Sequence, residues 1–94
     1  MALDELQIQC LDIVSNDYET FEIIQNELSK IHPKVTKDQI TKFLRNLIDR
    51  KYVDFYRYDE KSMKFIPLLD FKSEEMGKYF FMISSLGRNE IEQT

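Results

Sequence analysis

The strongest structural signals in the chain lie in residues 36–54, which read TKDQITKFLRNLIDRKYVD. Thr36 and Gln39 have the spacing of a capping box, in which each side chain accepts a hydrogen bond from the backbone N–H of the other residue. Apolar residues then recur every three or four positions, at Ile40, Phe43, Leu44, Leu47 and Ile48. The stretch predicts an amphipathic helix over residues 36–50, followed by a β-rich segment that starts at Tyr52.

Two more helices are expected before this one. Residues 2–15 carry an apolar stripe at helical spacing, and Cys10 lies within that stripe, so a buried position is predicted for its thiol. The same spacing predicts a second helix from about Thr20 to Lys30, with Thr20 or Asp17 as its N-cap. Pro33 ends this helix, because a proline disfavours helical backbone in the residue before it.

Strands and a terminal helix are expected after residue 51. Residues 52–58 and 64–69 are rich in β-forming residues, and the polar residues 59–63 between them suit a hairpin loop. Residues 70–78 are interpreted as a connection to a further strand over residues 79–83. Ser84 can then cap a terminal helix.

The composition is typical of one soluble domain. Of the 94 residues, 43 % are hydrophobic and 32 % are charged, and only two are glycine and two proline, so a single α+β domain over residues 1–94 is expected. No apolar run approaches the roughly 20 residues that cross a bilayer, and the N-terminus lacks the basic start of a signal peptide. A single cysteine forms no intramolecular disulfide, which favours a reducing, cytoplasmic location without a membrane partner.

Charge is unevenly distributed along the chain, whose formal net charge is −4. Residues 1–29 hold seven acidic side chains and no lysine or arginine, whereas residues 30–51 hold seven basic and two acidic ones. Residues 52–94 hold six basic and eight acidic side chains. A basic segment between acidic flanks can form an electrostatic footprint on an acidic protein. Chance clustering on solvated helix faces is the competing interpretation.

The order helix, helix, helix, strand, loop, strand resembles a winged helix-turn-helix. Residues 36–51 running into residues 52–54 look like the recognition helix and first wing strand of that superfamily. Residues 83–91 are similar to the closing strand-to-helix motif of MarR-like and PadR-like regulators, with Ser84 where threonine is usual and Gly87 at the motif's glycine. Because Gly87 has no side chain, the helix and the sheet are expected to approach closely at this position. The resemblance implies three N-terminal helices, a β-hairpin wing with a further strand, and a short C-terminal helix.

The resemblance also implies a transcriptional regulator whose helix 36–50 enters the major groove of double-stranded DNA. Arg45 or Lys42 would donate to guanine, and Asn46 or Gln39 would pair with adenine. The residues expected at nucleic acid are Lys34, Thr36, Lys37, Gln39, Thr41, Lys42, Arg45, Asn46, Arg57, Lys61 and Lys64. The residues expected to meet phosphates are Lys34, Lys37, Arg57, Lys61 and Lys64.

A protein–protein interaction module without DNA binding is the alternative function, because a fold does not by itself define a function. The surface charge discriminates between the two. A continuous positive stripe from the third helix to the wing favours DNA, whereas acidic groups that interrupt the stripe favour a protein partner.

Nine of the twelve aromatic residues lie between residues 52 and 81. Tyr52, Tyr56 and Tyr58 alternate with Val53 and Phe55, so one strand face is left over after the other is buried. The terminal helix could cover this second face. Alternatively, the face is an association surface, such as a homodimer contact, which is common in such regulators. Stacking on single-stranded bases is a third interpretation.

No catalytic constellation, cofactor motif or set of metal ligands is recognisable in the sequence, so no cofactor is expected and an enzyme is not the favoured class. The single histidine, His32, is expected in a loop beside Pro33.

Overall fold

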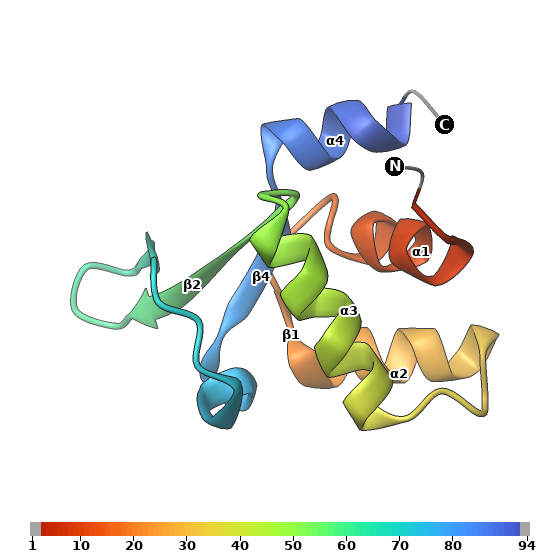
Figure 1. Cartoon of the computed structure of the whole chain (residues 1–94). Coiled ribbons are helices and arrows are strands. Elements are labelled where there is room, and N and C mark those ends of the chain that lie inside the picture. The colour runs from red at the N-terminus through yellow and green to blue at the C-terminus, as the bar shows by residue number, and fades with distance from the viewer. Residues whose placement is uncertain (1–2, 93–94) are drawn as a thin grey trace.

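The computed structural model describes residues 3–92 and has a mixed α+β architecture, drawn in Figure 1. In chain order its elements are α1 (Glu5–Ile13), β1 (Glu19–Thr20), α2 (Phe21–Ile31), α3 (Lys37–Asp49), β2 (Val53–Asp59), β3 (Lys64–Pro67), the 3-10 helix η1 (Ser73–Lys78), β4 (Phe80–Ile83) and α4 (Ser85–Glu92). None of the helices within residues 3–92 has the length and apolar character needed to cross a membrane.

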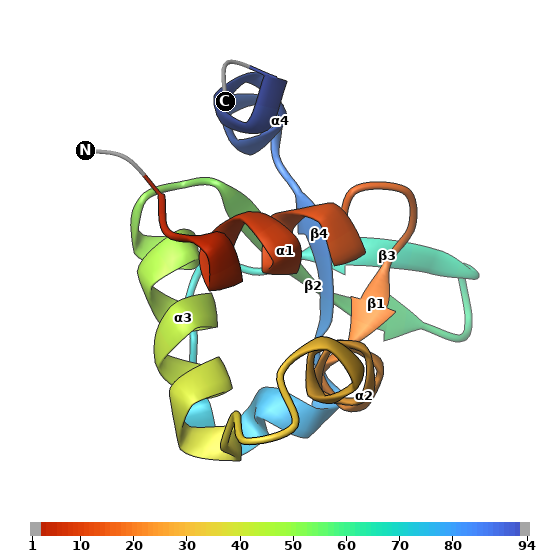
Figure 2. The same cartoon turned by 90° about the vertical axis from the view of Figure 1, so that its right-hand side faces the viewer.

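The four strands form one antiparallel sheet in the order β1-β4-β2-β3. β2 and β3 make the predicted hairpin, with Tyr58 opposite Phe65. The chain then passes through η1 and returns as β4 on the other side of β2, where Phe55 lies opposite Phe81. Figures 1 and 2 show α1, α2 and α3 grouped beside the sheet, with the hairpin projecting away from them.

Side-chain caps set where the helices begin. The predicted capping box at α3 is confirmed, because Thr36 N donates to Gln39 Oε1 at 2.9 Å and Gln39 N donates to Thr36 Oγ1 at 3.1 Å. Thr20 is the N-cap of α2, accepting from Ile23 N at 3.3 Å. A second capping box, between Asp4 and Gln7, starts α1.

The first helix is shorter than predicted. The expected range was residues 2–15, and residue 2 lies outside the described residues. Because the Asp4 carboxylate caps the backbone, α1 begins at Glu5, and it ends at Ile13. Two elements were missed, the two-residue strand β1 and the 3-10 helix η1 within the predicted connection.

One core joins the helices to one face of the sheet. Its fully buried side chains include Ile40, Leu44 and Leu47 of α3 and the predicted buried Cys10, whereas Phe43 and Ile48 of the apolar stripe are half-buried. The core residues are Leu3, Cys10, Leu11, Val14, Phe21, Ile24, Leu28, Ile40, Leu44, Leu47, Val53, Phe55, Met76, Tyr79, Phe81 and Ile83. Burial raises the pKa of the Cys10 thiol to about 12, so it stays a neutral, unreactive thiol at ordinary pH.

The junction between β4 and α4 has the close approach predicted from Gly87. Ser84 Oγ donates to Lys51 O at 2.6 Å and accepts from Gly87 N at 3.0 Å, so Ser84 caps α4 while holding it against the start of β2. A Cβ atom on Gly87 would collide with the Tyr52 carbonyl oxygen and lie 2.9 Å from Ile83 Cγ1. Only glycine therefore fits at this point without a shift of the backbone.

Replacing Thr36 by alanine is expected to lower the free energy of unfolding by about 1 kcal/mol, because it removes the Oγ1 atom that accepts from Gln39 N in the α3 capping box. Chemical denaturation measures the change. Thr41→Ala is the matched control, since the Thr41 hydroxyl only donates to Lys37 O within α3. Equal losses from the two substitutions would contradict the role given to the cap.

Candidate nucleic-acid interface

The residues predicted at nucleic acid on the third helix share one surface of the protein. The core side of α3 is occupied by Ile40, Leu44 and Leu47, which are fully buried. The predicted residues lie on the remaining surface of α3 and just before it, and all except the half-buried Thr41 are exposed. They are Lys34, Thr36, Lys37, Gln39, Thr41, Lys42, Arg45 and Asn46.

Five of these side chains already have partners within the protein. Thr36 Oγ1 accepts from Gln39 N at 3.1 Å. The Gln39 carboxamide is held in the capping box, and Asn46 Oδ1 accepts from Gln7 Nε2 of α1 at 3.0 Å. Thr41 Oγ1 donates to Lys37 O at 2.9 Å. Arg45 Nη1 donates to Ser73 Oγ of η1 at 3.4 Å, so this hydrogen bond joins two segments that are distant in the sequence.

These internal hydrogen bonds show which of the residues predicted to contact bases are free to do so. A bidentate contact to adenine uses both the oxygen and the nitrogen of a carboxamide. The oxygens of Gln39 and Asn46 each accept one internal hydrogen bond, so an adenine would compete with these bonds for the two side-chain amides. Lys42 is exposed and has no hydrogen-bond partner within the described part of the chain, and the long Arg45 contact is exposed to solvent. Lys42 and Arg45 are therefore the best placed to reach a ligand.

The cations around α3 are available for an external anion. Within residues 3–92 the one ion pair joins Lys30 Nζ to Glu27 Oε1 at 3.2 Å, on the outer surface of α2. Lys34, Lys37, Lys42 and Arg45 are exposed and take no part in an ion pair.

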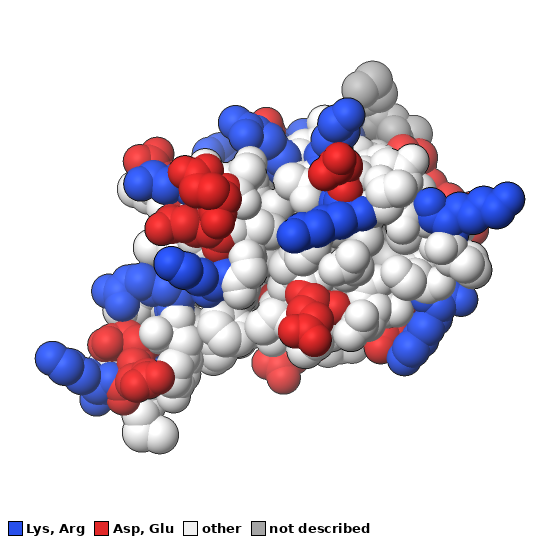
Figure 3. Space-filling view, turned by 90° about the horizontal axis from the view of Figure 1, so that it is seen from below, with Lys and Arg blue, Asp and Glu red and all other residues white. Residues whose placement is uncertain are grey.

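Acidic side chains share the same surface. Asp38 and Asp49 are exposed on α3, and Asp38 lies in the first turn, where a carboxylate complements the helix dipole. Seen from below in Figure 3, groups of basic and acidic side chains alternate across the protein. The positive surface is thus interrupted rather than continuous.

The three predicted cations of the wing, Arg57, Lys61 and Lys64, are exposed on the β2–β3 hairpin. Figures 1 and 2 show this hairpin projecting away from α3, so the structure places the two predicted groups of residues on separate parts of the surface. At the hairpin loop, Ser62 Oγ donates to Asp59 Oδ2 at 2.6 Å, and this hydrogen bond lowers the pKa of Asp59.

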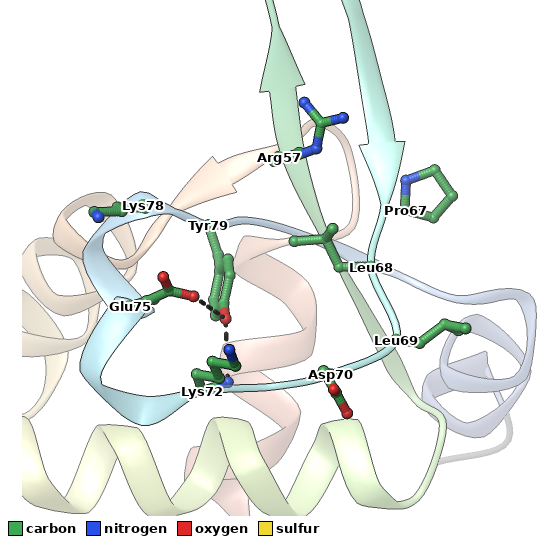
Figure 4. Close-up of a pocket in the computed structure, with 9 residues that line it drawn as sticks. All are labelled: Arg57, Pro67, Leu68, Leu69, Asp70, Lys72, Glu75, Lys78 and Tyr79. Carbon is green, nitrogen blue, oxygen red and sulfur yellow. Dashed lines mark hydrogen bonds between the residues drawn. The ribbon is translucent and has the colours of Figure 1, made fainter.

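A cavity of about 560 Å³ lies between the hairpin and η1, and it was not predicted from the sequence. Tyr79 is at its centre, where its hydroxyl accepts from Lys72 N at 3.1 Å and donates to Glu75 Oε2 at 3.3 Å, as Figure 4 shows. The lining consists of Arg57, Pro67, Leu68, Leu69, Asp70, Lys72, Glu75, Lys78 and Tyr79. Arg57, predicted at phosphate, therefore also borders a pocket of mixed charge.

The described residues offer no site for metal chemistry, because residues 3–92 contain no group of three or more His, Cys, Asp or Glu side chains able to hold an ion. His32 caps the end of α2, and its Nε2 lies 2.6 Å from Gln9 Oε1 of α1. The histidine thus joins two helices.

No family model matches the chain, and comparisons with curated proteins and with solved structures find no match either. The class of the protein is therefore inferred from its topology and from the side chains on α3.

Proposed function

We propose that the chain is a winged-helix protein that binds double-stranded DNA through α3 and acts as a cytoplasmic regulator of transcription. The topology supports this proposal. Three helices precede the β2–β3 hairpin, and the short strand β1 lies between α1 and α2 and pairs with β4. This is the order expected from the resemblance to winged helices, with β1 and η1 as the two unexpected elements.

The observation that carries the proposal is the set of exposed, unpaired cations at and before α3. Lys34 and Lys37 lie at the N-terminal end of the helix, followed one and two turns later by Lys42 and Arg45. Phosphate contacts supply much of the affinity of proteins for DNA. Cations that are already solvated and unpaired can make such contacts without first breaking an internal ion pair.

In this proposal α3 lies in the major groove with its N-terminal half closest to the bases. Arg45 and Lys42 donate to guanine edges, while Lys34 and Lys37 contact phosphates. The hairpin cations Arg57, Lys61 and Lys64, which lie apart from α3, contact the DNA backbone outside the groove that α3 enters. No enzymatic activity is assigned.

The proposal predicts a strongly salt-dependent affinity. Each phosphate neutralised contributes about −0.9 to the slope of log K against log salt, so phosphate contacts by Lys34, Lys37 and the three hairpin cations give a slope of about −4 to −5. Fluorescence anisotropy of labelled, mixed-sequence duplexes across a salt series measures this slope. Absence of binding at low salt, or binding that salt leaves unchanged, would contradict the proposal.

The second candidate is a winged-helix protein-interaction module that does not bind DNA. Asp38 and Asp49 favour it, because both interrupt the positive surface of α3. The Asp49→Asn substitution separates the two functions. If α3 meets DNA, removing this carboxylate tightens binding several-fold; if α3 meets a protein, neither the natural chain nor the variant shifts the anisotropy of the duplex.

A further inference from the structure

The cavity between the β2–β3 hairpin and η1 is held in shape by the core. Tyr79, which lines it, is only 4 % exposed. The Tyr79 ring contacts three other rings, with centroids 5.2, 5.6 and 6.2 Å away, and these belong to Phe55, Phe71 and Phe81. Met76 is buried as well and anchors η1. The cavity is therefore formed before any ligand arrives, as most small-molecule sites are.

One wall of the cavity is apolar. β3 ends at Pro67, and Leu68 N donates to Phe55 O at 3.0 Å, so the chain stays beside β2 for one more residue. Leu68 is half-buried, whereas Leu69 is 98 % exposed. Pro67, Leu68 and Leu69 all line the cavity, so an apolar group of a ligand placed there would remove apolar surface from water.

Five charged side chains border the same cavity, and no two of them form an ion pair. They are Arg57, Asp70, Lys72, Glu75 and Lys78. Within residues 3–92 the one ion pair joins Lys30 to Glu27, and neither of these lines the cavity. A ligand of a single charge, such as a phosphate, would meet groups of like charge as well as opposite charge. A ligand that carries both charges can pair with both kinds of group.

Glu75 is suited to accept from an ammonium group. Its carboxylate is half-buried, and Oε2 accepts from the Tyr79 hydroxyl at 3.3 Å. Figure 4 shows the carboxylate held beside this hydroxyl. Oε1 makes no hydrogen bond within residues 3–92, so it is free to accept from a ligand. An ammonium group brings three donors and no acceptor.

Arg57 is suited to bind a carboxylate. A guanidinium presents its donors in a planar fork that matches the two oxygens of a carboxylate. Arg57 is exposed on β2, and its guanidinium makes no hydrogen bond or ion pair within the described part of the chain. Figure 4 shows Arg57 and Glu75 on different sides of Tyr79. The cavity thus offers a cation and an anion at separate positions with apolar surface beside them.

We propose that this cavity binds a small apolar zwitterion, a molecule with an ammonium group, a carboxylate and an apolar body. Glu75 binds the ammonium group, Arg57 binds the carboxylate, and the apolar body lies against Leu68, Leu69 and Tyr79. The volume of about 560 Å³ is within the roughly 300–1,000 Å³ of small-molecule sites. An apolar amino acid and a short apolar peptide with free ends both have this chemistry, with different distances between the charges. The inference stands on the cavity alone and does not depend on DNA binding.

An NMR titration of the isotopically labelled chain with L-leucine and with L-leucyl-L-leucine tests the proposal and compares the two charge spacings. Saturable amide shift changes are expected at Arg57 and over residues 67–79. The dipeptide with an acetylated amine or with an amidated carboxylate is expected to bind at least about tenfold more weakly than the free dipeptide, since each loses a charge-assisted hydrogen bond. Unchanged spectra with both zwitterions, or a blocked dipeptide that binds as tightly as the free one, would overturn the proposal.

Two neighbouring carboxylates provide a matched pair of variants. Glu75→Gln keeps an oxygen that can accept from the Tyr79 hydroxyl but removes the charge, so it is expected to weaken the better zwitterion at least about tenfold. It is not expected to weaken the acetylated dipeptide, which has no ammonium group. Glu74→Gln removes the same charge from an exposed residue that does not line the cavity, and it is expected to leave the affinity unchanged. Circular dichroism checks that both variants fold. Equal weakening by the two variants would overturn the proposal.

Discussion

Replacing Gly87 by alanine is expected to destabilise the fold by about 3 kcal/mol, near the upper end of what overpacking usually costs. The direction is opposite to that of helix propensity, since alanine is the better helix former inside α4 by about 1 kcal/mol. The clash is decisive because the obstacle is the Tyr52 carbonyl oxygen, a backbone atom that also accepts from Ser84 N at 2.9 Å. Relieving the clash would displace α4 from the start of β2. Thermal or chemical denaturation measures the loss.

Gly77→Ala is the matched control for this prediction. An added Cβ at Gly77 meets no atom within 4 Å, and the residue does not have positive φ. The substitution is therefore expected to be neutral or stabilising by a few tenths of a kcal/mol, mainly through the unfolded state. Equal destabilisation by the two substitutions would contradict the prediction, because it would show that the contact with Tyr52 O is not the cause of the loss at Gly87.

Charge reversal of both Lys42 and Arg45 to glutamate is expected to reduce the affinity for duplex DNA by at least about a hundredfold. Each substitution removes a donor at the groove and adds a negative charge facing phosphate. The double variant is expected to keep its fold, because both side chains are exposed and outside the core. Anisotropy titration at low salt measures the loss.

The matched control reverses the same number of charges elsewhere. Lys30 on α2 and Lys78 at the end of η1 are exposed, and neither belongs to the predicted interface. Lys30→Glu with Lys78→Glu makes the same change in net charge, so it is expected to reduce affinity only through the long-range field of the protein. Similar losses in the two double variants would contradict a specific role for α3.

The sequence was most informative where the structure depends on local interactions. The capping box of Thr36 and Gln39 and the apolar stripe of α3 involve residues a few positions apart, and both predictions are confirmed. The hairpin and the burial of Cys10 are confirmed for the same reason. Gly87 is the exception, since its predicted close approach depends on the distant Tyr52.

The missed elements depend on partners far along the chain. β1 has only two residues, Glu19 and Thr20, too few for a pattern of alternation, and it is a strand because it pairs with Phe80 and Phe81. η1 is stabilised through Tyr79, whose hydroxyl bonds to Lys72 N and to Glu75. The residues of β1 and η1 alone do not indicate these interactions with other parts of the chain.

The surface chemistry of α3 was predictable only in part. A helical wheel places the exposed residues correctly, since it depends only on the helix period. It does not show that Asn46 is held by Gln7 of α1 or that Arg45 contacts Ser73 of η1. These contacts join segments that are distant in sequence, and they change which side chains are free to read a base.

The most direct test of DNA binding through α3 is an NMR titration of the isotopically labelled protein with a short mixed-sequence duplex at low salt. The largest amide shift changes are expected from Lys34 to Asn46, with smaller changes at the hairpin residues Arg57, Lys61 and Lys64. Unchanged spectra, or changes confined to α1 or α2, would contradict the account.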